Sequence, residues 1–137
     1  MKEQLQEKLN NLSTQPGVYL FRDKSGHILY VGKAKSLRPR VRSYFQNSQA
    51  LSPKTAVLLN KVWDVETILV DTEIEALILE ATLIKKHKPK YNINLRDDKS
   101  YPYIRITNEL LPRIFVTRRI FKDGSKYLGP FTDVRHL

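Results

Sequence analysis

The stretch from residue 17 to residue 32 reads Gly-Val-Tyr-Leu-Phe-Arg-Asp-Lys-Ser-Gly-His-Ile-Leu-Tyr-Val-Gly, and it predicts a β-hairpin. Its middle, Asp23-Lys24-Ser25-Gly26, consists of turn-forming residues. The runs on either side are rich in the aromatic and β-branched residues that favour strands. We therefore expect antiparallel strands over residues 17–22 and 27–32, which contain the triplets Gly17-Val18-Tyr19 and Tyr30-Val31-Gly32.

The register of this hairpin controls which side chains meet. If residues 23–26 form the loop, Arg22 pairs with His27, and Tyr19 lies directly opposite Tyr30 with Cβ atoms about 4.5–5.5 Å apart. The two phenols then lie side by side, and the glycines of the two triplets leave the same face open for a ligand to approach the backbone. Packing of the sheet is the alternative role for either tyrosine alone.

A basic segment follows the hairpin at once. Residues 33–42 contain five cationic side chains and no acidic one, and residues 37–45 predict a helix. Taking Arg38 as zero on a helical wheel, Arg42 lies near 40° and Arg40 near 200°, because successive residues turn by about 100°. We expect Arg38 and Arg42 to face solvent or a DNA backbone, whereas Arg40 and Tyr44 reach back toward the hairpin. Paired phenols beside a basic helix favour chemistry on a phosphodiester.

Bulk properties narrow the class of protein. The chain has 137 residues, a formal net charge of +10 and a sequence pI of about 9.9, which favour a polyanionic partner such as nucleic acid. Cations concentrate at 33–42, 85–90 and 113–126. The absence of cysteine excludes disulfides, thiolate metal sites and cysteine nucleophiles. No apolar run predicts a signal peptide or a membrane span, so we expect a cytoplasmic protein without a membrane partner.

The remaining patterns predict an α/β fold of the α+β type, with a small, mainly antiparallel three-stranded sheet flanked by helices and followed by an additional β segment. We expect one domain over 1–98 and an additional β segment over 99–137, in a chain that is a fragment of something longer. Thr72 opens the longest helix with a Thr-x-x-Glu capping box, and Pro89 closes it. The further helices are expected at 2–12, 54–61 and 73–88, and the further strands at 63–70, 101–107, 113–121 and 126–128.

Glu80 is the most informative acidic residue. On the expected helix, its neighbours three and four positions away are all apolar: Ala76, Leu77, Leu83 and Ile84. An unpaired buried charge costs several kcal/mol, so the carboxylate needs a partner. An arginine is one possibility, and a divalent cation with mostly water ligands is the other, because Mg²⁺ often binds through only one or two carboxylates.

These motifs resemble those of the GIY-YIG nucleases, with valine in place of isoleucine in both triplets. The resemblance is to the UvrC family in particular, and it extends over essentially the whole chain. It is carried by the segments Tyr30-Val31-Gly32-Lys33-Ala34-Lys35, Arg38-Pro39-Arg40-Val41-Arg42-Ser43-Tyr44-Phe45, Leu79-Glu80-Ala81-Thr82-Leu83-Ile84-Lys85-Lys86, Pro89-Lys90-Tyr91-Asn92, Tyr101-Pro102-Tyr103-Ile104 and Leu128-Gly129-Pro130-Phe131.

The resemblance implies a role for each matching residue. Tyr30 acts as general base or its relay, and Lys33 polarises its phenol. Glu80 is the single ligand of one Mg²⁺ or Mn²⁺ ion, and Arg40 binds the scissile phosphate. Tyr19 and Tyr44 position the attacking water, and Asn92 supports the site. Contacts to DNA are expected from Lys35, Arg38, Arg42, Lys85 and Lys86.

The family implies a function in nucleotide excision repair, within the response to DNA damage. Its members cut the damaged strand of duplex DNA on the 3′ side of a lesion, acting with UvrB after UvrA. The second nuclease and the UvrB-binding part would follow residue 137. Two alternatives stay open: a homing or structure-specific nuclease of the same superfamily, and a nucleic-acid-binding module that does not cleave.

Overall fold

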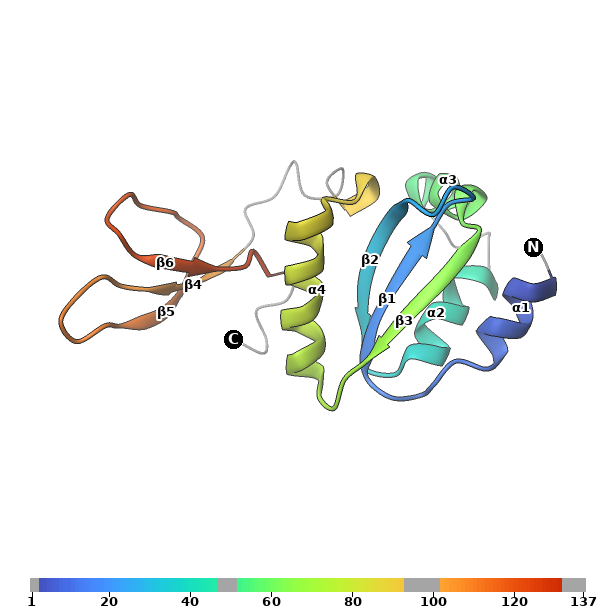
Figure 1. Cartoon of the computed structure of the whole chain (residues 1–137), viewed down its shortest axis with the longest axis horizontal. Coiled ribbons are helices and arrows are strands. Elements are labelled where there is room, and N and C mark those ends of the chain that lie inside the picture. Colours follow the sequence, from blue (N-terminus) through green and yellow to red (C-terminus); the bar gives the residue numbers. More distant parts are fainter. Residues whose placement is uncertain (1–2, 47–51, 93–101, 132–137) are drawn as a thin grey trace.

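The computed structural model describes residues 3–46, 52–92 and 102–131. Its first sheet has three antiparallel strands in the order β2-β1-β3, with β1 (Gly17–Arg22) in the centre. The edge strands are β2 (Ile28–Ala34) and β3 (Asp64–Leu69), as Figure 1 shows. The α+β architecture expected from the sequence is confirmed.

Helices cover both faces of this sheet. α1 (Glu3–Asn10), α2 (Leu37–Gln46) and α3 (Pro53–Lys61) pack against the face that carries Tyr19 and Phe21. α4 (Glu73–His87) packs against the opposite face, where Ala76 and Ile84 meet Val18, Leu20 and Val31. Alternation along β1 separates these two cores, because successive side chains of a strand point to opposite faces. In Figure 1, α4 runs alongside β2, the edge strand on its side of the molecule.

The expected register of the hairpin is wrong by two residues. Tyr19 pairs with Gly32, and Tyr30 pairs with Phe21. The loop is one residue shorter than expected, because Asp23, and not Arg22, pairs with His27: the Asp23 N–H donates to the His27 carbonyl at 3.0 Å. Leu29 then forms a β-bulge: it is an extra residue of β2 between the pairs Arg22–Ile28 and Phe21–Tyr30. Because two shifts of one residue restore the original face, Tyr19 and Tyr30 still share a surface as diagonal neighbours.

The glycines of the two triplets do not leave an open face. A Cβ atom on Gly32 would lie 2.3 Å from Cζ and Oη of Tyr19, whose ring crosses directly over that glycine. A Cβ atom on Gly17 would lie 2.4 Å from the Ile68 carbonyl oxygen. Both glycines are therefore required by close packing within the protein, and the space that we assigned to a ligand is filled by Tyr19 and Ile68.

The ends of α4 follow from local sequence. Thr72 is the N-cap, and its hydroxyl accepts a hydrogen bond from the Glu75 N–H. The Glu75 carboxylate accepts in turn from the Asp71 N–H at 3.1 Å, one residue before the position that a standard capping box uses. Lys88 ends the helix in the left-handed conformation with φ 45°.

A second sheet lies on the other side of α4 (Figure 1). It consists of β4 (Tyr103–Ile106), β5 (Ile114–Thr117) and β6 (Lys126–Leu128) in the antiparallel order β5-β4-β6. The strand expected over 113–121 ends at Thr117. Phe131 and Ile104 pack against Leu77 and Ala81 of α4, so this helix is buried from two sides. The expected boundary between residues 98 and 99 lies outside the described residues and stays a prediction.

Candidate active site at the edge of the first sheet

Three tyrosines form a cluster where β1, β2 and α2 meet. The ring centroids of Tyr19 and Tyr30 lie 6.3 Å apart, and those of Tyr19 and Tyr44 lie 5.9 Å apart. The hydroxyl oxygens of Tyr19 and Tyr44 share a hydrogen bond of 2.8 Å. Phe21 supports the cluster from beneath, with its ring 6.0 Å from that of Tyr30 and 5.2 Å from that of Tyr44. Packing thus fixes the positions of all three phenols.

Arg40 extends from α2 over this cluster. Its guanidinium lies 5.3 Å from the centre of the Tyr44 ring, and Nη2 donates to the Tyr44 hydroxyl at 3.4 Å. The residue is exposed, so its remaining donors are available to a ligand at the surface. The expected orientation of Arg40 toward the hairpin is confirmed, and the arrangement offers a rigid phosphate-binding fork beside the phenols.

The orientation expected for Arg38 is wrong, and Arg42 is less exposed than expected. Arg38 donates from Nε to the Leu12 carbonyl at 2.6 Å, and its backbone N–H donates to the Ser13 carbonyl. Arg42 is half-buried, and its buried Nε has no partner among the described residues. A helical wheel gives angles between side chains, but it cannot tell which neighbouring segments cover those angles. Here the segment after α1 covers the side of α2 on which Arg38 lies.

Glu80 is buried on α4, with 5% of the residue exposed, as its apolar neighbours predicted. Its negative charge is one of the causes that raise the pKa of Tyr30, so the carboxylate and the phenol lie near enough to interact. Among the described residues, no three His, Cys, Asp or Glu side chains gather in one place. A buried carboxylate is a hard oxygen ligand of the kind that a divalent cation prefers.

The pKa values of Tyr19 and Tyr30 are set mainly by burial. Burial, followed by Tyr44 and Glu80, raises the pKa of Tyr30, and burial followed by Tyr44 and Tyr30 raises that of Tyr19. The positive charge of Arg40 acts in the opposite direction on both. Tyr19 and Tyr30 therefore hold their protons at neutral pH. Conversely, the tyrosines, Tyr19 first, raise the pKa of the Arg40 guanidinium against the opposing effect of burial.

Asn92 connects the segment after α4 to the edge of the sheet. Its side-chain amide donates to the Val31 carbonyl at 2.9 Å and accepts from the Val31 N–H at 2.8 Å. The buried amide thus pairs with edge strand β2 as a neighbouring strand would, between Tyr30 and Gly32. The sequence did not indicate that Val31 is the partner of Asn92, because Val31 binds it through backbone atoms, which every residue has.

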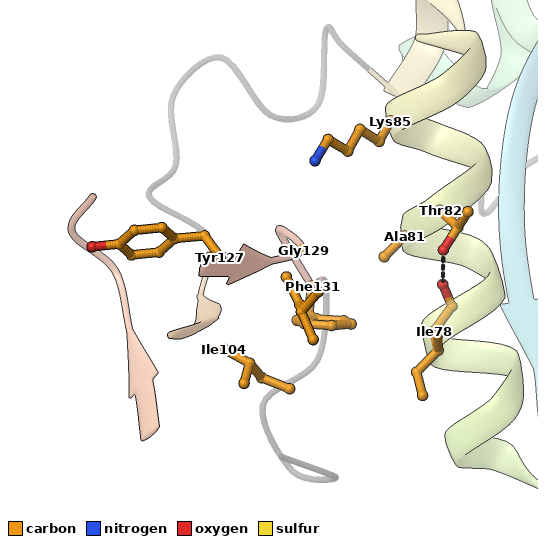
Figure 2. Close-up of a pocket in the computed structure, with 9 residues that line it drawn as sticks. Ile78, Ala81, Thr82, Lys85, Ile104, Tyr127, Gly129 and Phe131 are labelled. Atoms are coloured by element: carbon orange, nitrogen blue, oxygen red, sulfur yellow. Dashed lines mark hydrogen bonds between the residues drawn. The ribbon is translucent and has the colours of Figure 1, made fainter. Parts of the chain in front are cut away.

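The sequence assigns Lys33 to the Tyr30 phenol, and Lys35, Lys85 and Lys86 to contacts with DNA. Lys33 is half-buried on β2, and Lys35 is exposed with Nζ 3.9 Å from a Glu73 carboxylate oxygen. Lys85 and Lys86 are both exposed near the end of α4. In Figure 2, Lys85 points into a largely apolar crevice of about 310 Å³ between α4 and the second sheet. That crevice lies on the far side of α4 from the tyrosines, so it is not part of the candidate active site.

Fold and site together define a class of protein. A three-stranded antiparallel sheet with paired tyrosines, an arginine from the following helix and one buried glutamate from the opposite layer is the arrangement of a GIY-YIG nuclease domain. The family model for the UvrC-like GIY-YIG domain matches residues 15–93, and the chain belongs to that family.

Individual relatives agree with this assignment. The chain is 59% identical over 127 residues to UvrABC system protein C of Caldicellulosiruptor saccharolyticus, covering 93% of this chain and 21% of that protein. It is 56% identical over 133 residues to UvrABC system protein C of Carboxydothermus hydrogenoformans, covering 97% of this chain and 22% of that protein. The chain thus spans about one fifth of the length of the curated relatives that it matches.

A solved structure gives the same fold. The crystal structure of the GIY-YIG N-terminal endonuclease domain of UvrC from Thermotoga maritima, bound to its catalytic divalent cation magnesium, superposes with a TM-score of 0.60. The two sequences are 44% identical, and the match covers 67% of this chain and 99% of that domain. The described part of the present chain contains no helix that is long and apolar enough to cross a membrane.

Proposed function

We propose that this chain hydrolyses a phosphodiester bond of DNA with one divalent cation held by Glu80, as the nuclease that cuts 3′ of a lesion in nucleotide excision repair. The observation that carries the proposal is the buried Glu80 carboxylate, which lies near enough to the Tyr30 phenol to raise its pKa. The magnesium-bound domain of Thermotoga maritima and the names of the relatives support the proposal.

The chain's own residues divide the chemistry among them. Arg40 clamps the scissile phosphate through its exposed donors, and Tyr44 holds that guanidinium in place. Tyr30 retains its proton, so we assign it the role of relay: its Oη accepts a proton from the attacking water while its own proton passes to a neighbouring solvent water. Lys33 stabilises negative charge that develops on this phenol. A bound divalent cation supplies Lewis-acid stabilisation of charge on the phosphate oxygens.

The other tyrosines and Asn92 act by positioning. Tyr19 orients Tyr44 through the hydrogen bond between their hydroxyls, and together they order the attacking water. Asn92 keeps the edge strand between Tyr30 and Gly32 in register with the segment after α4. Preorganised groups of this kind lower the barrier because they need not rearrange as charge develops.

The whole protein's partners follow from the same assignment. We propose that damaged duplex DNA is the substrate and that UvrB recruits the protein after UvrA, mainly through parts that the present chain lacks. Lys35 and Lys86 are exposed and suited to backbone contacts. Mg²⁺ is the cation in the Thermotoga maritima domain, and we expect Mn²⁺ to substitute for it. A cytoplasmic location and a role in the SOS response belong to this proposal.

Replacement of Glu80 tests the proposal. In the full-length protein, we expect Glu80→Gln to abolish both Mg²⁺ binding, measured by calorimetry, and nicking of lesion-containing DNA with UvrA and UvrB. The matched control is Glu66→Gln, an exposed carboxylate of the first sheet whose partner is Arg22. It should retain both activities, because exposed ion pairs contribute only about 0–1 kcal/mol. Unchanged Mg²⁺ affinity in Glu80→Gln would contradict the assignment.

The number of protein ligands has its own test. Crystals soaked in Mn²⁺ should give one anomalous peak beside Glu80, with no second carboxylate in contact. A peak held by two or more carboxylates would exclude the single-ligand site. A full-length protein that binds DNA but never nicks it at saturating Mg²⁺ or Mn²⁺, with UvrA and UvrB present, would favour the non-cleaving binding module instead.

A further inference from the structure

The second sheet has two chemically different faces. Its register places Arg105 of the central strand directly between Phe115 of β5 and Tyr127 of β6. Tyr103 lies two residues before Arg105 and therefore on the same face, with its ring 6.3 Å from that of Tyr127. The opposite face is aliphatic and includes Ile104, which packs toward α4. We call the first of these the aromatic face; it consists of Tyr103, Arg105, Phe115, Phe121 and Tyr127.

Arg105 is held in the centre of this face. Its guanidinium forms an ion pair with Asp123, and its Nε donates to the Ser125 hydroxyl at 3.3 Å. The guanidinium carbon lies 5.4 Å from the centre of the Phe115 ring and 5.1 Å from that of Phe121. The rings and the guanidinium thus form one assembly of flat π-surfaces, fixed by hydrogen bonds from the loop before β6.

Phe121 belongs to this face although it is not in a strand. The Tyr127 hydroxyl accepts a hydrogen bond from the Phe121 N–H at 2.9 Å. This contact folds the loop between β5 and β6 back over the sheet, so that the Phe121 ring reaches Arg105. If β5 continued to residue 121, as the sequence predicts, the Phe121 ring would extend away from Arg105. Because β5 ends at Thr117, the loop can fold back.

Two rings of the aromatic face reach the surface, whereas Tyr103 and Tyr127 are half-buried. Phe115 is 37% exposed and Phe121 is 49% exposed. Figure 2 shows the Tyr127 ring pointing away from α4, whereas Phe131 lies between the sheet and that helix. Ile104, whose side chain lies on the other face of the sheet, is the strand residue that packs against Leu77 and Ala81 of α4.

The charge around this face suits a polyanion. Residues 102–131 contain six cations and two acidic residues, Glu109 and Asp123. Both acids are already paired, with Arg113 and Arg105 respectively. Exposed cations lie in the loop that contains Phe121; they are Arg118, Arg119 and Lys122. Lys126 is also exposed, but it pairs with Ile106 and therefore belongs to the other face of the sheet.

We propose that the aromatic face binds unpaired bases of single-stranded DNA, by stacking them on Phe115 and Phe121 while the surrounding cations contact the phosphates. Exposed rings on a small antiparallel sheet, interleaved with cations, are the combination by which proteins hold single strands without sequence preference. A duplex cannot use such a face, because its bases are already stacked. The inference rests on residues 102–131 alone and does not depend on hydrolysis at Glu80.

The opposing explanation is that Arg105 and the rings merely replace a hydrophobic core in a very small sheet. If the rings only stabilise the sheet, other apolar side chains of similar volume can replace them without loss of binding. Base stacking, in contrast, needs the flat aromatic rings, so variants that keep apolar volume but remove the rings separate the two explanations. Phe115→Leu and Phe121→Leu together make such a variant. The matched control is Ile114→Ala with Leu128→Ala, two exposed aliphatic side chains on the opposite face.

The test measures fluorescence anisotropy of labelled oligothymidine and of a duplex of equal length, bound to the 137-residue chain and to both variants. We expect the ring variant to bind oligothymidine about tenfold more weakly, with duplex affinity unchanged. The control should bind both as the unaltered chain does. Lys122→Ala should reduce the slope of log K against log salt for the single strand by about 0.7. Equal losses on single strand and duplex, or no loss on the single strand, would overturn the proposal.

Cross-linking of the unaltered chain locates the bound single strand directly, even if the ring variant fails to fold. Oligothymidine carrying 5-iodouracil should form photo-cross-links that map by mass spectrometry to Phe115, Phe121 or Tyr127. Cross-links confined to residues 33–42 would place the single strand on the first sheet and would exclude the aromatic face.

Discussion

At the scale of single residues, the proposed chemistry depends on a few polar atoms, such as the hydroxyl oxygen of Tyr30, whereas the rest of each side chain packs. Tyr30 is the clearest case, since its ring packs against Phe21 and Tyr19 whereas its hydroxyl is the reacting group of the proposed mechanism. Packing and chemistry can therefore be separated by removing a single oxygen.

We predict that Tyr30→Phe removes nicking by the full-length protein and changes its DNA affinity less than twofold. The ring remains to fill its place, whereas the proton relay is lost. Single-turnover nicking with UvrA and UvrB, together with equilibrium DNA binding, measures both quantities. Tyr91→Phe, which removes a hydroxyl from a buried tyrosine outside the cluster, is the control and should nick normally. Nicking by Tyr30→Phe near the normal rate would exclude the relay.

At the scale of secondary-structure elements, positions are fixed by contacts at helix ends and strand edges. β2 is an edge strand, so Val31 has free backbone groups on one side, and Asn92 satisfies them with a buried amide. α2 is similarly attached to the segment after α1 through Arg38. These two contacts allow predictions about how elements are held.

We predict that Asn92→Ala lowers the free energy of unfolding by about 2–4 kcal/mol, because it leaves a buried donor and a buried acceptor of Val31 unsatisfied. Denaturant unfolding measures the loss. Amide hydrogen exchange should accelerate at Val31 much more than at Leu20, which lies on the central strand. Protection at Val31 equal to that of the unaltered protein would show that another group or water satisfies the edge.

We predict that two arginines of α2 differ in kind. Arg40→Ala should lower the single-turnover nicking rate at saturating DNA and leave stability within about 0.5 kcal/mol, because the side chain is at the surface. Arg38→Ala should instead destabilise the protein by about 1–2 kcal/mol, since its charged donor bonds to the buried Leu12 carbonyl. Thermal melts and nicking assays on both variants separate the two roles. Equal effects on the nicking rate would argue that α2 acts as one uniform basic face.

At the scale of the whole molecule, α4 is the common wall between two sheets. Ala76 and Ile84 face the first sheet, whereas Leu77 and Ala81 face the second. The Thermotoga maritima domain, which matches 67% of this chain over 99% of its own length, shows that a chain about two-thirds as long suffices for the GIY-YIG fold. The second sheet should therefore be the dependent unit.

We predict that Phe131→Ala releases the second sheet and leaves the first one folded. Phe131 is 3% exposed and joins the second sheet to Leu77 and Ala81, and removal of a buried phenylalanine costs about 3–5 kcal/mol. Hydrogen exchange should show lost protection at Ile104 and retained protection at Leu20. Leu110→Ala, at a side chain that is 99% exposed, should change neither. A single cooperative transition of the whole variant would mean that both sheets form one folding unit.

The sequence alone determined the features that depend on near neighbours in the chain. The position of the turn, though not the pairing that it sets, the capping of α4 by Thr72 and the burial of Glu80 within an apolar stripe are local patterns that the structure confirms. They were predictable because hydrogen bonding within a turn and helix periodicity involve residues only a few positions apart. The family's motifs added the roles of these residues, which stay predictions.

Only the tertiary structure decided how those pieces meet. The closure of the turn at Asp23 and His27 and the bulge at Leu29 together set which residues oppose Tyr19 and Tyr30, so that these tyrosines are diagonal neighbours and not a direct pair. Asn92 pairs with a strand 61 residues earlier in the chain, and the segment after α1 covers the side of α2 that a helical wheel assigned to solvent. Each of these outcomes depends on packing between segments that are distant in the sequence. Such contacts produce no local pattern of residues from which they could be predicted.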